Sequence, residues 1–179
     1  MTIATQLSGT TLILGGARSG KSSYGEKLVL NTKLHPVYIA TAQAHDDEMR
    51  ARITEHKNRR DTNWITIEEP LALCEVLSNH ATPENAILVD CLTLWLSNLM
   101  MAGKDIEEET MQLTNLMPKL AGPVVFVSNE VGMGLVPETS VGRTFRDHQG
   151  RLNQCVARVA DSVQFIAAGY PLILKPENK

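Results

Sequence analysis

A glycine-rich octapeptide near the start of the chain constrains the fold more than any other feature: Gly15-Gly16-Ala17-Arg18-Ser19-Gly20-Lys21-Ser22. It matches the pattern G-x-x-x-x-G-K-[ST], whose backbone N–H groups surround phosphates while the lysine neutralises β and γ oxygens and the hydroxyl ligates Mg²⁺. An apolar run at residues 11–14 precedes it, and a helical pattern from Gly20 to about Leu30 follows it. Because the motif needs a strand before it and a helix after it, these residues predict a phosphate-binding loop, or P-loop.

Short apolar runs recur along the chain, at residues 37–40, 64–67, 86–89, 124–127 and 163–167. Helical patterns lie between most of them, at residues 92–101, 107–120 and 141–160, and a charged segment at 46–60 has acids in its first turn and bases in its last. This alternation predicts an α/β fold of the P-loop NTPase (RecA-like) class, with a mostly parallel sheet flanked by helices. Gly169-Tyr170-Pro171 predicts a turn into an antiparallel edge strand at residues 172–174.

Length and composition narrow the function. A chain of 179 residues fits one compact domain, and its net charge of −3 argues against nucleic acid or a membrane surface as partners. Cys74, Cys91 and Cys155 are an odd number without metal-type spacing, which predicts buried thiols in a reducing compartment. No stretch reaches the ~20 apolar residues of a membrane helix, and the first ten residues do not read as a leader. We therefore expect a cytoplasmic protein without membrane insertion.

A P-loop needs an acidic group for its metal, usually at the end of a buried strand. Asp90 directly follows the apolar run 86–89, so it is the candidate partner of Ser22 in holding Mg²⁺. The alternative is that Asp90 caps the helix predicted from Leu92, a position that aspartate favours. The two roles are compatible.

His56 lies in a charged segment where helical spacing places Arg52 and Arg59 or Arg60 beside it. A basic face near a P-loop suits a triphosphate, and neighbouring cations favour the neutral imidazole that can attack phosphorus. A lone histidine on a charged helix is more often a solvated surface residue, so the pattern alone leaves both interpretations open.

Six blocks follow one another in order between about residues 11 and 175. They are the P-loop, Tyr38-Ile39-Ala40-Thr41-Ala42-Gln43 with Asp46-Asp47-Glu48-Met49, Arg52-Ile53-x-x-His56-Lys57, Asp90-Cys91-Leu92-Thr93-Leu94-Trp95, Ser128-Asn129-Glu130-Val131-Gly132-Met133-Gly134, and Phe145-Arg146-Asp147-x-x-Gly150-Arg151-x-Asn153-Gln154. Together they resemble the bifunctional adenosylcobinamide kinase/adenosylcobinamide-phosphate guanylyltransferase family. Residues 1–10 have no counterpart in the resemblance, which implies an N-terminal extension before a single domain at 11–179.

The resemblance implies two reactions: phosphorylation of adenosylcobinamide by ATP or GTP, then transfer of GMP from GTP through a GMP–histidine intermediate to give adenosylcobinamide-GDP. Its nucleophile falls on His56, preceded here by Glu55 where some members have a second histidine, whereas His45 does not match. The implied partners are adenosylcobinamide, adenosylcobinamide-phosphate, GTP and ATP, and the implied cofactor is Mg²⁺. The resemblance also implies a homotrimer. Besides Gly15, Gly16, Ala17, Arg18, Ser19, Gly20, Lys21 and Ser22, the implied nucleotide contacts are Thr41, Ala42, Gln43, Lys57, Asn58, Arg59, Arg60, Glu68 and Asp90.

Several residues keep two interpretations. Glu130 either activates the substrate hydroxyl or holds Mg²⁺, or else is a structural carboxylate satisfied by loop N–H groups. For Asp147 and Arg151, helical spacing favours an i, i+4 ion pair over a functional role. Asn153 is likewise either structural or functional. Trp64 and Trp95 lie in apolar runs and are expected in the core. A simple small-molecule kinase and a nucleotide-dependent switch or motor subunit are the rival functions, the latter without a basic stripe to support it.

Overall fold

The computed structural model describes residues 7–43 and 63–176. Seven strands form one sheet in the order β3-β2-β4-β5-β1-β6-β7, and every pair is parallel except β6 with β7. The strands are β1 Thr10–Gly15, β2 His35–Ala40, β3 Ile65–Glu68, β4 Asn85–Asp90, β5 Val124–Asn129, β6 Ser162–Ala167 and β7 Tyr170–Lys175. The predicted fold class, with its antiparallel edge strand near the C-terminus, is confirmed.

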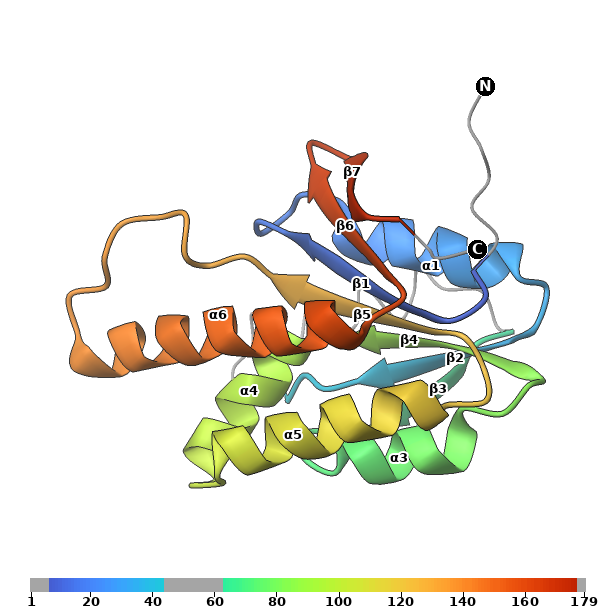
Figure 1. The fold of residues 1–179 in the computed structure, drawn as a ribbon, viewed down its shortest axis with the longest axis horizontal. Coiled ribbons are helices and arrows are strands. Elements are labelled where there is room, and N and C mark those ends of the chain that lie inside the picture. The colour runs from blue at the N-terminus through green and yellow to red at the C-terminus, as the bar shows by residue number, and fades with distance from the viewer. Residues whose placement is uncertain (1–6, 44–62, 177–179) are drawn as a thin grey trace.

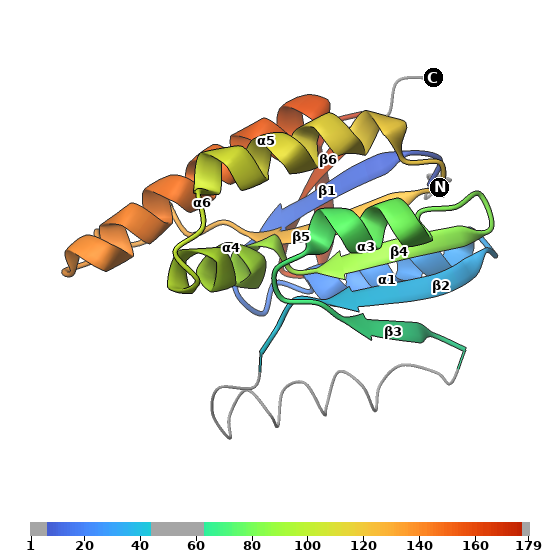
Figure 2. The same ribbon diagram turned by 90° about the horizontal axis from the view of Figure 1, so that it is seen from below.

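Helices cover the two faces of the sheet unequally. Helix α1 (Lys21–Asn31) lies on one face, and α3 (Leu73–His80), α4 (Leu92–Met101), α5 (Ile106–Leu116) and α6 (Ser140–Val159) lie on the other (Figures 1 and 2). The larger core cluster packs these four helices against one side of the strands, and the smaller one packs α1 against the other. Apolar side chains therefore pack against both faces of the sheet. Because the strands from β3 to β6 in the sheet order are parallel, their carboxyl ends lie along one edge.

Helix α1 approaches the sheet closely because it has a glycine at the contact. A Cβ atom added to Gly25 would lie 2.8 Å from Leu88 Cδ1 and 3.4 Å from Ile13 Cδ1. Both partners belong to central strands and are fully buried. The helix that carries Lys21 and Ser22 is therefore seated directly over β4, β5 and β1.

Most predicted elements are found, with two changes of extent. The helix expected at 107–120 ends as an α-helix at Leu116 and continues as a 3₁₀ turn over Met117–Lys119, because Pro118 cannot donate an i→i−4 bond. The last strand is longer than expected and includes Pro171, which an edge strand tolerates. The charged helix predicted at 46–60 lies outside the described residues.

The predicted core position is confirmed for Trp95 and only in part for Trp64. Trp95 is fully buried and its Nε1 donates to the Leu71 carbonyl at 2.9 Å. Trp64 is half-buried at the margin of the smaller cluster, edge-on to Tyr38 with ring centroids 6.2 Å apart. In the described part of the chain, no helix is long and apolar enough to cross a membrane.

Candidate nucleotide-binding site

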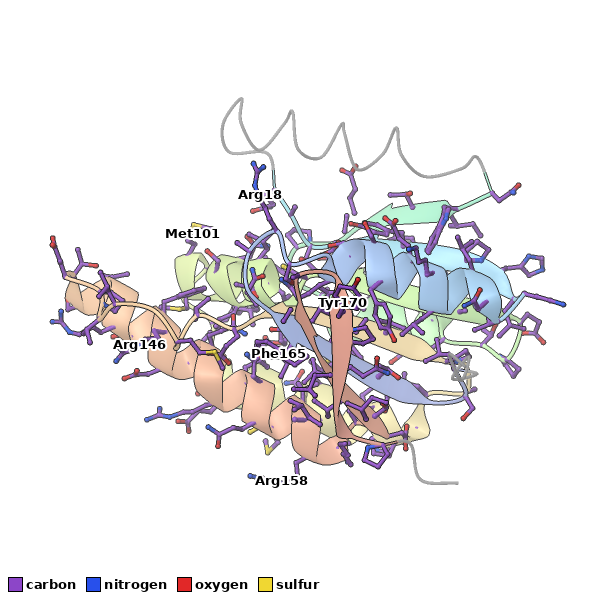
Figure 3. The ribbon with its side chains drawn as sticks, turned by 90° about the horizontal axis from the view of Figure 1, so that it is seen from above. Arg18, Met101, Arg146, Arg158, Phe165 and Tyr170 are labelled. Carbon is purple, nitrogen blue, oxygen red and sulfur yellow. The ribbon has the colours of Figure 1, made fainter. Side chains whose placement is uncertain are left out.

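The P-loop follows β1 and leads directly into α1. Gly15 has φ 151° and Gly20 has φ 100°, both in the region that favours glycine, and Arg18 is left-handed at 56°. A Cβ on Gly15 would lie 2.5 Å from the Ile166 carbonyl oxygen, so the loop has no room for a side chain there. The Gly169 N–H donates to the Ser19 carbonyl at 2.8 Å and ties the loop to the β6–β7 turn. Arg18 is exposed and points away from the loop (Figure 3).

Lys21 reaches back into the P-loop. Its side chain is buried, and Nζ donates to the Gly16 carbonyl at 2.6 Å. Burial lowers the pKa of Lys21, while the nearby Cys91 and Asp90 act in the opposite direction. An anionic phosphate that enters the loop would stabilise this desolvated ammonium group, because it restores the charge interactions that burial removed.

Asp90 is the last residue of β4 and lies beside Ala40 in the register of the sheet. Its carboxylate Oδ2 accepts a hydrogen bond from the Tyr38 hydroxyl at 3.0 Å. The N-cap of α4 is Cys91, which makes no side-chain capping bond, so the interpretation of Asp90 as a helix cap is wrong. Asp90 is still part of β4, so the capping position is occupied by the next residue. Burial lowers the pKa of Lys21, and the Asp90 carboxylate, a smaller effect, raises it.

Thr41 holds the end of β2 against the end of β4. Its buried hydroxyl donates to the Cys91 carbonyl at 2.7 Å and accepts from the Cys91 N–H at 2.8 Å. The Asn98 side chain donates to the Thr41 carbonyl at 2.7 Å. These bonds give Thr41 a structural role, and its predicted contact with nucleotide stays a prediction, as do those of the half-buried Ala42 and the exposed Gln43. Nothing in the sequence pattern singled out Asn98.

The segment after β5 lies beside the P-loop. Asn129 pairs with Gly15 in the sheet, and the Glu130 N–H donates to the Gly15 carbonyl at 3.0 Å. The Glu130 side chain accepts from the Gly132 N–H at 2.6 Å, the contact expected of a structural carboxylate. The loop therefore reaches the sheet edge that the sequence predicted for it.

Two predictions on α6 have different outcomes. The expected ion pair between Asp147 and Arg151 is wrong, because Asp147 pairs with Arg146 at 3.2 Å in the part of the chain that the structure describes. Asn153 is buried and bonded to Ser128 and Asn129, which favours its structural interpretation. The neighbouring Gln149, also buried, had no signal in the sequence beyond a polar residue on the inward helical face.

Several predicted site residues lie outside the described residues: His56, Lys57, Asn58, Arg59 and Arg60, as does His45, which was not predicted to be part of the site. Glu68 is described, with an exposed side chain at the carboxyl end of β3, beside Ala40 in the sheet. The described P-loop, Asp90 and Glu68 thus all lie at or beside the carboxyl edge where open α/β sheets bind ligands.

Ser22 and Asp90 offer a hydroxyl and a carboxylate, the hard oxygen ligands that Mg²⁺ accepts. Among the described residues there is no group of three acidic, histidine or cysteine side chains that could hold a metal ion. A magnesium site of the P-loop type needs only one or two protein oxygens, because water and substrate phosphates supply the other ligands.

The strand order and the loop after β1 define the class of protein, a P-loop nucleotide-binding α/β fold. Two examples among the solved structures that are similar to it have the same TM-score. One is the flagellar accessory protein FlaH from Methanocaldococcus jannaschii, with a TM-score of 0.54, 12% identity and 94% of this chain and 79% of that chain covered. The other is an ATPase domain, with a TM-score of 0.54, 12% identity and 97% of this chain and 78% of that chain covered. At this identity the likeness concerns the fold alone.

The family is defined by sequence. The model described as "Cobinamide kinase / cobinamide phosphate guanyltransferase" matches residues 11–174. The chain is 46% identical over 168 residues to the bifunctional adenosylcobalamin biosynthesis protein CobP of Pseudomonas aeruginosa, covering 93% of this chain and 97% of that protein. It is 38% identical over 179 residues to CobU of Salmonella typhimurium, covering 92% and 98%. The chain belongs to this family, and it is a cobinamide kinase and cobinamide phosphate guanylyltransferase of cobalamin biosynthesis.

Proposed function

We propose that the chain carries out its two reactions in succession on adenosylcobinamide, with the P-loop serving both. In the first, the γ-phosphoryl group of ATP or GTP passes to the aminopropanol hydroxyl of the corrinoid, and the nucleoside diphosphate leaves. The observation that supports this role is the buried Lys21, which already faces the inside of the P-loop through its 2.6 Å bond to the Gly16 carbonyl. Replacing that carbonyl by phosphate oxygens gives the ammonium group a charged partner.

In the proposed second reaction, neutral His56 attacks the α-phosphorus of GTP, a P–N bond forms, and pyrophosphate leaves. The phosphate of adenosylcobinamide-phosphate then attacks the same phosphorus, the P–N bond breaks, and adenosylcobinamide-GDP is released. Covalent catalysis of this kind divides one transfer into two easier steps. His56 lies outside the described residues, so its support is the motif with Lys57, Arg59 and Arg60 rather than geometry.

The remaining nucleotide contacts that we propose are Gly15–Ser22 as a phosphate cradle, Ser22 and Asp90 for Mg²⁺, and Thr41, Ala42, Gln43, Lys57, Asn58, Arg59, Arg60 and Glu68 around the nucleotide. When bound, the ion would neutralise charge on the transferring phosphate. Lys21 neutralises the β and γ oxygens from the protein side, and the loop N–H groups orient them.

The assembly and location are also proposals. We propose a cytoplasmic homotrimer built from a single nucleotide-binding domain at 11–179 with an extension at 1–10. Residues 7–10 nevertheless pack with the domain, because β1 includes Thr10 and Leu7 lies in the smaller core cluster.

The experiment that tests the histidine step compares His56→Ala with His45→Ala. Each protein is incubated with α-labelled GTP and Mg²⁺, and bound label and its site are measured by mass spectrometry, beside a separate assay of adenosylcobinamide phosphorylation. We expect His56→Ala to lose the acid-labile GMP adduct and guanylyl transfer while retaining phosphorylation, because γ-transfer needs no protein nucleophile. His45→Ala should keep the adduct. An adduct on His56→Ala would place the nucleophile elsewhere, and a wild-type protein without any adduct would favour the simple kinase.

A further inference from the structure

A cluster of buried polar side chains joins α6 to the end of β5. Ser128 and Gln149 are fully buried and Asn153 is 5% exposed. The Ser128 hydroxyl donates to Asn153 Oδ1 at 2.6 Å, and Gln149 Nε2 donates to both Ser128 Oγ and Asn153 Oδ1 at 2.9 Å. We call these three residues the amide cluster.

The amide cluster is connected to the P-loop through backbone bonds. Asn153 Nδ2 donates to the Asn129 carbonyl at 3.1 Å, and the Asn129 N–H donates to the Thr93 hydroxyl at 2.8 Å. The next residue, Glu130, donates its N–H to the Gly15 carbonyl at 3.0 Å. The position of residues 129–130 is therefore set from one side by α6 and from the other by the first residue of the P-loop.

Stability alone does not account for the cluster. Gln149 Oε1 is buried and has no hydrogen-bond partner in the described part of the chain, which costs free energy of folding. Replacing all members of a buried polar pair by apolar side chains of similar volume is often neutral or stabilising. A buried network that is incompletely satisfied, yet directional, serves to select one arrangement of the groups it bonds.

The same helix also borders a cavity. Arg146, Gly150 and Arg151 of α6 and Gly132 of the segment after β5 are among the residues that line a cavity of about 310 Å³. Arg146 lies on α6 near its exposed end (Figure 3). Residues 129–132 thus run between the P-loop and this cavity, so a shift of the segment would change how the two face each other.

We propose that Gln149 and Asn153 are positioning residues, which hold residues 129–132 against the P-loop and thereby set the rate of transfer to the acceptor rather than the affinity for nucleotide. The proposal rests on the kinase and guanylyltransferase activity of the family. Positioning effects of this kind act on kcat, since a displacement of about 1 Å at a reacting group can cost about 100-fold in rate.

The first test replaces the unsatisfied amide without changing its volume much. Gln149→Leu is compared with Gln112→Leu, the same substitution at an exposed helical glutamine of α5. We expect kcat for adenosylcobinamide phosphorylation to fall at least about tenfold in Gln149→Leu, with KM for GTP within about twofold of wild type and with the protein still folded at the assay temperature, as thermal melting checks. Wild-type kcat in a folded Gln149→Leu protein would overturn the proposal.

The second test uses the bond to the Asn129 carbonyl. Asn153→Asp keeps the acceptor for Ser128 and Gln149, but it donates to Asn129 only when its carboxyl group is protonated, and burial raises the pKa of such a group. We expect kcat of the variant relative to wild type to rise as pH falls from about 8 to about 6, with the folded fraction checked by circular dichroism at each pH. A constant ratio of one would contradict the positioning role.

The two proposals fail in different ways. A wild-type protein without turnover that depends on adenosylcobinamide would contradict the proposed substrate. A wild-type protein with that activity, accompanied by Gln149→Leu and Asn153→Asp variants of equal kcat at every pH, would contradict only the positioning role.

Discussion

At the scale of single residues, the candidate site contains ionisable side chains whose burial disfavours their charged form. Lys21 is buried with a lowered pKa, and the Cys91 thiol beside it is held protonated, with burial raising its pKa to about 12. A buried thiol of this kind is not a nucleophile at neutral pH. We therefore propose a direct part in phosphate chemistry for the charged side chains of Lys21 and Asp90 and not for Cys91.

Lys21→Ala should lower both activities by about 100-fold or more, because it removes the cation that neutralises the β and γ phosphates in either reaction. Lys27→Ala is the matched control, since Lys27 is exposed on the same helix. Nucleotide affinity is measured by calorimetry and turnover by product formation. Normal rates for both reactions in Lys21→Ala would mean that Gly15–Ser22 is not the working phosphate site.

Asp90→Asn should raise the Mg²⁺ concentration needed for half-maximal turnover and leave the fold intact. Asparagine can still accept the Tyr38 hydroxyl bond but offers no charge to a metal. Tyr38→Phe is the control that removes the hydrogen bond and keeps the charge. If Mg²⁺ titrations of Asp90→Asn and wild type coincide, Asp90 is structural.

At the scale of elements, the seat of α1 on the sheet decides where the P-loop opens. Gly25 allows this contact because a side chain there would meet Leu88, whereas a Cβ on Gly150 in α6 would meet nothing within 4 Å. The same residue type thus has opposite consequences in the two helices. The sequence alone treats both as helix-weakening glycines.

Gly25→Val should lower the free energy of unfolding by about 1–3 kcal/mol, the usual cost of overpacking a core. Gly150→Val should change it by less than about 0.5 kcal/mol, because its site is open and valine has the better helix propensity. Urea denaturation of both variants gives the comparison. Equal stability would show that α1 moves away from the sheet without cost.

At the scale of the whole molecule, β7 is an unusual edge. Tyr170, Leu172, Ile173 and Leu174 are each more than half exposed, and the strand pairs only with β6 among the described strands (Figure 3). Edge strands with exposed apolar side chains favour association with another chain. This surface supports the proposed homo-oligomer.

Light scattering should therefore give a mass of about three times the 19.7 kDa of the chain. Ile173→Asp should shift the population toward the monomer, because it places a charge on an apolar contact surface. Lys104→Glu, at the exposed turn between α4 and α5, should leave the mass unchanged. A trimer that survives Ile173→Asp would place the interface elsewhere.

Local signals explain most of what the sequence predicted correctly. The strand–loop–helix at residues 10–31 and the run before Asp90 could be read directly, because glycines, a lysine and short apolar runs act within one or two elements. The prediction of an ion pair between Asp147 and Arg151 was wrong because several basic side chains lie within reach of Asp147, and its side-chain conformation pairs it with Arg146. The interpretation of Asp90 as a helix cap was wrong because β4 ends at Asp90 and the capping position is the following residue.

By itself, the sequence determined the fold class, the P-loop and the acid at the end of β4, since each is encoded by residues that are neighbours along the chain or periodic within one element. Only the tertiary structure decided which distant groups meet: Thr41 with Cys91, Gly15 with Glu130, and the amide cluster of Ser128, Gln149 and Asn153. Such contacts depend on strand order and on the face that each helix buries, and neither is specified by residue type alone.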